Sequence, residues 1–270
     1  MKPPKRLTFP KLQSRIRRCA LTVCVAAICE DNIILGASDR MVTAGDVEFE
    51  PPQTKVTFLT SSIAVMIAGD ASLQLEIMYE VRNEVQVRVE AAPSNWWQVK
   101  DVANLYFKHF KKAKRTRTES AILDPIGLDY DSFITRQQEL SSELVDKLAT
   151  EVLNFEMSEI ETIVTGVDPT GPHIYVVSNR GVACRDSVGF AAIGAGYWHA
   201  NSQFMFAGHA RSKPIPQTLL LAYAAKKRAE VAPGVGEATD MFWIGPAVGI
   251  SFPVGDHVVG KLGEIYLRLL

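Results

Sequence analysis

Four residues near the start of the chain carry groups suited to breaking an amide bond: Thr22, Asp39, Lys55 and Gly69. A threonine hydroxyl is a weak nucleophile unless a base takes its proton. If Thr22 is the first residue, its own α-amino group, with a reference pKa of about 7.7 to 8.0, can be that base. A neighbouring Lys55 would favour the neutral amine and stabilise the alkoxide, while Asp39 would keep this lysine charged and in position. The backbone N–H of Gly69, at a predicted helix start, can receive the oxyanion of a tetrahedral intermediate.

A predicted β-hairpin places the first two of these residues together. Residues 23–29 and 33–37 are short apolar runs rich in β-branched residues, and the polar cluster Glu30-Asp31-Asn32 separates them. If the turn is centred between the first two residues of this cluster, Thr22 lies opposite Asp39. A one-residue change in the turn would shift this pairing by about one residue.

A second predicted hairpin carries the other two candidates. It consists of residues 54–59 and 63–68, joined by Thr60-Ser61-Ser62. A turn centred near the last of these serines places Lys55 opposite Gly69, and the chain then passes directly into a helix. The two hairpins therefore predict that a hydroxyl, a carboxylate, an ammonium group and a backbone donor share one open end.

The remaining patterns predict alternating blocks of helices and strands. Apolar residues spaced by three and four indicate helices over 70–89, 94–112, 140–152, 197–209 and 215–229, with residues 118–134 as a loop. Further strands are predicted over 161–166 and 173–178, in a segment ending near residue 187, and in a last hairpin over 239–244 and 247–251. This order favours a layered α+β domain over an alternating parallel α/β fold.

Residues 1–21 differ from the rest of the chain and are predicted to be a basic extension before a single domain over residues 22–270. Seven lysines and arginines and no acidic residue occur in residues 1–19, without the apolar centre of a secretory signal. Three interpretations stay open: a pro-segment removed to expose Thr22, a disordered or targeting tail, or a wrongly assigned start, the true one being at Leu21.

Composition argues against several other classes of protein. A net charge of −1 does not suit a general nucleic-acid binder, and the basic run at 111–117 is typical of a solvated helix end. No stretch approaches the roughly 20 apolar residues of a membrane span. The spacing of the four cysteines and five histidines suggests neither a disulfide framework nor a metal site. Reduced, buried thiols are expected, Cys19 is a weak rival nucleophile, and no cofactor is indicated.

At the candidate residues the sequence resembles the proteasome β-subunit branch of the N-terminal nucleophile (Ntn) hydrolases, as a divergent, bacterial-type member. The matching segments, in family order, are TVCVAAICEDNIILGASDR, TKVTFLTSSIAVMIAGDAS, TIVTGVDPTGPHIYVVSNRG and AAIGAG. The resemblance implies a four-layer αββα sandwich, assembly into homo-oligomeric rings, and a cytoplasmic threonine-type peptidase acting on peptide or amide substrates. It assigns Thr22 as nucleophile, Asp39 and Lys55 as its supporting pair, and Gly69 as the oxyanion donor.

Three positions depart from the family pattern. Ala195 replaces the serine of a Gly-Ser-Gly, a later Asp-x-x-Ser-Gly is absent around the sequence PGVGE of residues 233–237, and Leu21 stands where processed relatives carry glycine. Two alternatives therefore stay open: a catalytically inactive, ring-forming scaffold subunit, and an Ntn amidase or acylase with a small-molecule substrate. Whether an ATP-driven unfoldase acts with the protein is left open by the sequence.

Overall fold

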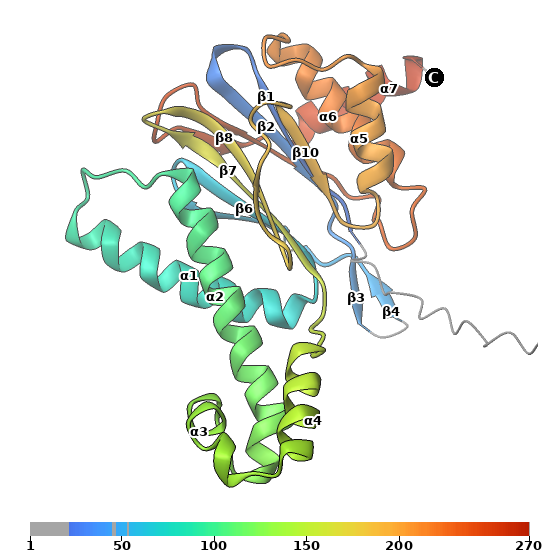
Figure 1. Ribbon diagram of the computed structural model, residues 1–270. Helices are drawn as coiled ribbons and strands as arrows, with labels where there is room; N and C mark the ends of the chain where they lie inside the picture. The colour runs from blue at the N-terminus through green and yellow to red at the C-terminus, as the bar shows by residue number, and fades with distance from the viewer. Residues whose placement is uncertain (1–21, 45–46, 53, 270) are drawn as a thin grey trace, which may run out of the picture.

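The computed structural model describes residues 22–44, 47–52 and 54–269, so the predicted extension over residues 1–21 lies outside the described residues. The described chain is a mixed α+β structure with antiparallel strand pairing, as predicted (Figure 1). The first sheet has the order β10 (Phe190–Ile193), β1 (Cys24–Cys29), β2 (Ile33–Ser38), β11 (Asp240–Ile244) and β12 (Ser251–Pro253). The second sheet has the order β5 (Val56–Thr60), β6 (Ile63–Gly69), β7 (Ile160–Asp168), β8 (Gly171–Ser178) and β9 (Gly181–Cys184). A short ribbon of β3 (Val42–Ala44) and β4 (Val47–Phe49) stands apart from both sheets.

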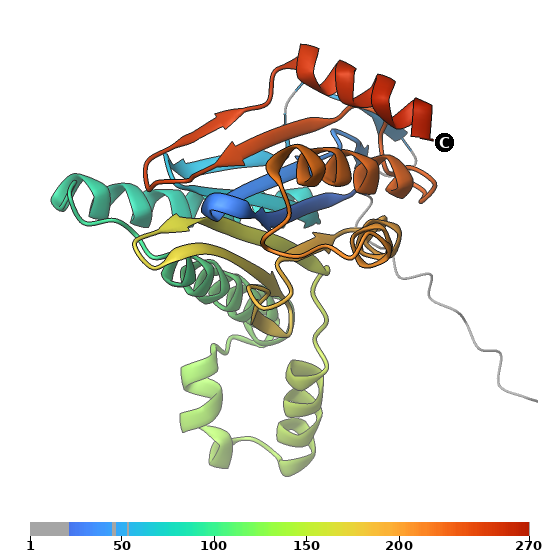
Figure 2. The same cartoon turned by 90° about the horizontal axis from the view of Figure 1, so that it is seen from above.

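Five helices lie on the outer sides of the two sheets (Figure 2): α1 (Ala71–Ala91), α2 (Val99–Thr118), α5 (Tyr197–Phe206), α6 (Ile215–Ala229) and α7 (Asp256–Leu269). The other two, α3 (Tyr130–Thr135) and α4 (Ser142–Leu153), lie away from the sheets. No helix in the described part of the chain combines the length and apolar character that a membrane span requires.

Strand β1 shows how the layers are held together. Alternate residues of a strand point to opposite faces, and here both faces are apolar. Cys24, Ala26 and Ile28 pack into a core shared with residues of the second sheet, so the two sheets face each other. Val25 and Ala27 pack into a core shared with α5, α6 and α7. Since both faces are buried, the strand reads as a continuous apolar run.

The register of both hairpins corrects the predicted pairings. Cys24 pairs with Ser38 in β1–β2, so the residue facing Asp39 by this register is Val23, one position away from Thr22. In the second hairpin Val56 pairs with Met66, and Gly69 pairs with Ile160 of β7. The expected Lys55–Gly69 pairing is therefore wrong, because the turn brings Thr60 opposite Ile63 and strand β5 contains a further register shift between Phe58 and Thr60 that pattern alone does not reveal.

Residues 118–134 form helical structure instead of the predicted loop. Helix α2 begins at Val99, later than the predicted residue 94, and continues to Thr118; a π-helical turn (Glu119–Leu123) and α3 follow. Together with α4 these segments form a helical lobe over residues 119–153, below the sheets in Figure 1. Its own small core, which includes Leu123, Phe133 and Leu148, explains why this stretch is ordered into helices.

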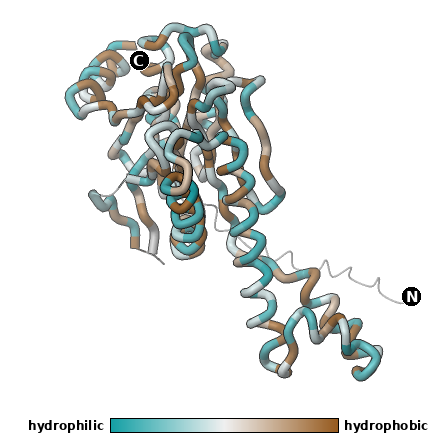
Figure 3. Tube along the Cα trace, turned by 90° about the vertical axis from the view of Figure 1, so that its left-hand side faces the viewer, coloured by the Kyte–Doolittle hydropathy of each residue, from teal (hydrophilic) through white to brown (hydrophobic). Residues whose placement is uncertain are grey.

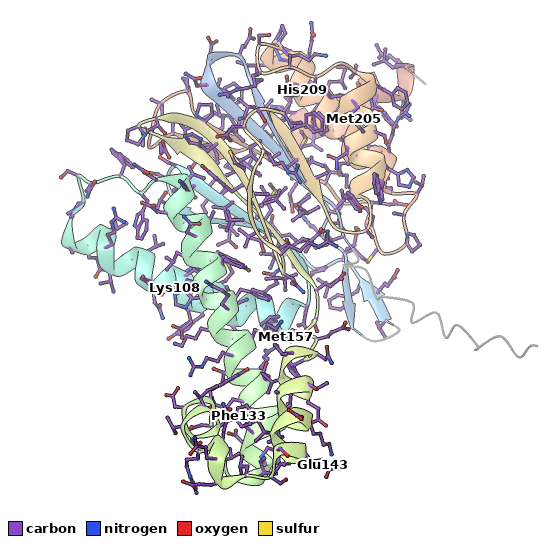
Figure 4. All side chains as sticks on the ribbon, viewed as in Figure 1. Lys108, Phe133, Glu143, Met157, Met205 and His209 are labelled. Carbon is purple, nitrogen blue, oxygen red and sulfur yellow. The ribbon has the colours of Figure 1, made fainter. Side chains whose placement is uncertain are left out.

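Figure 4 labels Phe133 inside the helical lobe and Met157 where the lobe joins the body, and Met157 packs against the core beneath α1 and α2. Figure 3 shows apolar and polar residues alternating along the lobe, as in amphipathic helices that share a narrow core. Most other helix and strand predictions agree with the structure. The last strand begins at Ser251 instead of residue 247, and the strand predicted to end near residue 187 ends at Cys184. No prediction anticipated α7 or the strands β3, β4 and β10.

Candidate active site

Thr22, Asp39 and Lys55 meet at one end of the two sheets. Thr22 lies two residues before β1 and Asp39 follows β2, and because these strands are antiparallel neighbours, the two residues lie at the same edge. Thr22 Oγ1 donates a hydrogen bond to Asp39 Oδ1, and Lys55 Nζ donates one to Thr22 Oγ1. Lys55 Nζ also lies 2.8 Å from Asp39 Oδ1. The hydroxyl thus contacts both a cation and an anion.

The carboxylate of Asp39 is fixed by backbone donors as well as by its two side-chain partners. Its Oδ1 accepts the N–H of Val23 at 3.0 Å, and its Oδ2 accepts those of Met41 and Gly236, each at 3.0 Å. Asp39 is 0% exposed, so each of these contacts offsets the cost of burying the charge. The orientation of the carboxylate, and through it that of Lys55, is therefore set by three separate segments of the chain.

Thr22 is 2% exposed, with its amino group still joined to residue 21. The segment after β10 packs closely against the backbone of Thr22. The Gly196 N–H donates to the Thr22 carbonyl oxygen at 3.3 Å, and a side chain at Gly194 would overlap that same oxygen. Gly194 also has a φ of +86°, which glycine adopts without steric cost. The Gly194-Ala195-Gly196 segment is thus shaped to pass close to the threonine.

Gly69 occupies the end of β6, immediately before α1. Its φ is +114°, and a side chain there would overlap the carbonyl oxygen of Glu159. Asp70 caps α1 by accepting the Leu73 N–H at 3.1 Å, as the sequence predicts. Direct contacts bring Thr22, Asp39 and Lys55 together, whereas Gly69 lies on the second sheet and its link to them is indirect.

Near this end of the sheets the Cys24 thiol of β1 donates to the carbonyl oxygen of Ile67 in β6 at 3.7 Å. The pKa of Cys24 is raised far above its ordinary value, chiefly by burial, so this thiol is inert. The expectation of buried thiols holds for Cys24 and Cys29, but Cys184 is exposed at the end of the edge strand β9.

Lys226 of α6 is a site residue that sequence reasoning missed. It is 0% exposed, and its Nζ donates to the carbonyl oxygens of Gly236 and Glu237, each at 2.8 Å, and to Glu230 Oε1 at 2.6 Å. It thereby holds the segment whose Gly236 N–H binds Asp39. Burial lowers the pKa of Lys226, and the neighbouring Glu230 opposes this. In the sequence it lies in a basic run typical of a helix C-terminus, so no pattern marks it.

Where the sequence lacks an Asp-x-x-Ser-Gly, a backbone group contacts Asp39. Around residues 233–237 the chain offers no side-chain hydroxyl or carboxylate to Asp39, but it offers the backbone N–H of Gly236. Arg40 does not pair with Asp39; its guanidinium binds Asp240 at 2.5 Å from Nη2 to Oδ1. The side-chain partners of Asp39 are therefore Lys55 and Thr22.

A search with protein-family models and a search of curated proteins found no match to this chain. Within the described residues no group of three or more His, Cys, Asp and Glu side chains is arranged to hold a metal ion. The chemistry that the site can support follows from its own geometry: a buried hydroxyl, held between an ammonium group and a carboxylate, beside a glycine-lined backbone.

Proposed function

We propose that the protein is a threonine-type amide-bond hydrolase, a peptidase of the Ntn kind, whose nucleophile is Thr22 with a free α-amino group. The observation that carries the proposal is the direct contact of Thr22 Oγ1 with both Lys55 Nζ and the buried Asp39. A hydroxyl in such surroundings is activated by the positive charge, while the carboxylate keeps that charge in place.

The reaction would proceed in two halves. Thr22 Oγ attacks the carbonyl carbon of the substrate as its proton passes to the α-amine of Thr22, and the resulting oxyanion is stabilised by a backbone N–H, for which Gly69 is the candidate. The ammonium then gives its proton to the leaving amine, and an ester remains on Thr22. Water, deprotonated by the same amine, hydrolyses this ester and releases the acid.

We further propose that the two facing sheets and their outer helices form the four-layer αββα sandwich of Ntn hydrolases. Three apolar cores support this arrangement: one between the second sheet and α1 and α2, one between the two sheets, and one between the first sheet and α5, α6 and α7. Each sheet is thus buried on one face by the other sheet and on the opposite face by helices.

The partners proposed are a peptide or amide substrate and further copies of the chain, in the cytoplasm. Large apolar side chains on α5 support self-assembly: Trp198, Met205 and Phe206 are 65%, 60% and 88% exposed. Met205 points outward from this helix in Figure 4. A scaffold subunit remains the competing function, favoured by the near-complete burial of Thr22 and by Ala195.

The test is to compare the full chain with a chain that begins at Thr22, obtained by cleaving a fused carrier. We expect the second to hydrolyse fluorogenic peptides and to be labelled by a peptide epoxyketone, which reacts with a hydroxyl and its adjoining amine. Thr22→Ser should still be labelled, and Thr22→Ala should not. A native protein that retains residues 1–21 while a free Thr22 remains unreactive would establish the scaffold instead.

A further inference from the structure

The carboxyl group of Glu161 lies beside the candidate site, and the mechanism above does not use it. Glu161 is the second residue of β7 and pairs with Ala68, next to the pairing of Gly69 with Ile160. Its Oε2 accepts the N–H of Gly194 at 2.8 Å. The carboxylate of Glu161, in the second sheet, thus contacts the segment that packs against Thr22.

Gly194 connects Glu161 to the threonine. An added Cβ at Gly194 would lie 2.7 Å from Thr22 Cγ2, so the two residues are in close contact, and Gly196 binds the Thr22 carbonyl oxygen. Burial raises the pKa of Glu161, the Gly194 N–H opposes this, and Glu159 adds to it. The charges of Lys55, Asp39 and Glu161 each act on the pKa of the buried Cys24 thiol, so all three residues lie near this thiol.

The proposed reaction requires such a group. When the α-amine of Thr22 takes up a proton, it becomes a cation beside the ammonium group of Lys55, and like charges disfavour this state. Asp39 is already occupied by Lys55, Thr22 and three backbone donors. Ala195 offers no hydroxyl.

We propose that Glu161 is a positioning residue that replaces the absent hydroxyl at position 195: its carboxylate holds Gly194 against Thr22, and its negative charge stabilises the protonated amine during turnover. This inference rests on the proposed function. Glu159 before β7 acts directly on Glu161, and the Cys24 thiol of β1 is influenced by Glu161, Lys55 and Asp39. Of these groups, Lys55 opposes protonation of the amine.

The experiment measures the titration of the Thr22 amine by NMR in protein that begins at Thr22 and carries labelled threonine. Glu161→Gln keeps an oxygen for the Gly194 N–H but removes the charge, so the amine pKa should fall by about one unit, and the acid limb of kcat/KM should move to lower pH with it. Glu159→Gln, an exposed carboxyl two residues away, should leave both within about 0.3 unit.

Two further variants separate charge from position. Glu161→Asp keeps the charge but shortens its reach, so the amine pKa should stay near that of the parent while kcat falls. Glu161→Ala should lower kcat/KM by about tenfold or more, and adding Ala195→Ser should restore several-fold of that loss, since it adds a hydroxyl to the segment that binds Thr22.

An unchanged amine titration in Glu161→Gln, or no recovery on adding Ala195→Ser, would overturn this inference even in a fully active enzyme. Conversely, a lowered amine pKa in a protein that hydrolyses no peptide would remove the proposed function and leave the electrostatic role of Glu161 standing. Should the Gln variant fail to fold, Glu161→Ala, which also removes the charge, serves the same titration.

Discussion

The chain contains two clusters in which a threonine hydroxyl meets a base and a carboxylate, and they lie at opposite ends of β7. Beyond its far end, Thr170 Oγ1 lies 2.7 Å from His173 Nε2, and His173 Nδ1 lies 2.6 Å from Asp186 Oδ2. By residue type this second cluster resembles a nucleophile, a base and an orienting acid. By geometry it is a turn, because the Thr170 hydroxyl donates its proton to Asp168 at 2.6 Å.

The two clusters differ in the groups that their hydrogen bonds connect. Asp168 also accepts the Thr170 N–H at 2.8 Å and the Val99 N–H at 2.9 Å, so the far cluster holds a turn and the start of α2. Thr170 is exposed, whereas Thr22 is 2% exposed and adjoins a buried carboxylate and lysine. Both hydroxyls donate to a carboxylate, so residue types do not define a nucleophile; burial and the ammonium group of Lys55 distinguish Thr22 from Thr170.

The largest expected effect separates the clusters by activity. Lys55→Met should lower kcat/KM for peptide hydrolysis by a factor on the order of 10³ or more, because it removes the charge that activates Thr22. His173→Gln, the matched change in the far cluster, should stay within about twofold of the parent. Steady-state kinetics on both variants tests this, and a severe loss in His173→Gln would mean that the far cluster is the catalytic one.

The next effect is on stability. Asp39→Asn should reduce the free energy of unfolding by about 3 kcal/mol, since it leaves the lysine, whose side chain is 12% exposed, without its countercharge. Asp186→Asn, at a side chain that is 20% exposed, should cost about 1 kcal/mol. Denaturant unfolding monitored by fluorescence measures both. Equal losses would show that the two carboxylates are held alike.

A third pair of variants tests the contacts by which Lys226 holds the segment that binds Asp39. Lys226→Met should destabilise the protein by about 2 kcal/mol and reduce kcat, because the carbonyl oxygens of Gly236 and Glu237 lose their buried donor. Lys227→Met, one residue along the same helix, removes contacts to Glu230 only and should cost less than about 1 kcal/mol. Thermal unfolding and kcat together show whether loss of packing alone explains the result.

The smallest effect concerns pH and the far cluster. Burial acts to raise the pKa of Asp168, but hydrogen bonds from Thr170 and the Val99 N–H outweigh it, so the pKa lies below its ordinary value. A lowered carboxyl pKa stabilises the fold above its unfolded-state value, about 3.9, and this contribution is lost as pH falls through the folded-state value. Thr170→Val should therefore cost about 1 kcal/mol or less at pH 7.

The same variant should differ less from the parent once the pH has fallen below the lowered pKa of Asp168, where this carboxyl is protonated in both. Thr170→Ser keeps the hydroxyl and should match the parent at every pH. A difference between Thr170→Val and the parent that does not change with pH would assign the loss to packing instead of to Asp168.

The sequence predicted most of the sheet and helix order because its apolar runs are periodic and its turns carry strong signals. The first hairpin, the strands predicted over 161–166 and 173–178, and the helix over Ile215–Ala229 all agree with the structure. Helix α4 of the lobe was predicted, but the helical structure over residues 118–134 was missed because its order comes from a small core of residues distant in sequence, among them Leu123 and Leu148, which local pattern does not reveal.

The candidate site was only partly predictable, for a related reason. Thr22, Asp39 and Lys55 were grouped by hairpin pairing, and they do meet, although the registers assumed were off by one and by two residues. Lys226 and Glu161 come from elements far along the chain, and their contacts end on backbone groups of other loops. Nothing in their neighbours in the sequence shows such partners.

The helical lobe has a separate hydrophobic core and joins the body through α2 on one side and the residues before β7 on the other. The exposed connection between α3 and α4 is therefore a suitable place to splice in a foreign domain, such as a fluorescent reporter, without disturbing the sheets. A chimera built there would report on the location of the protein in living cells while leaving the contacts of Thr22, Asp39 and Lys55 intact.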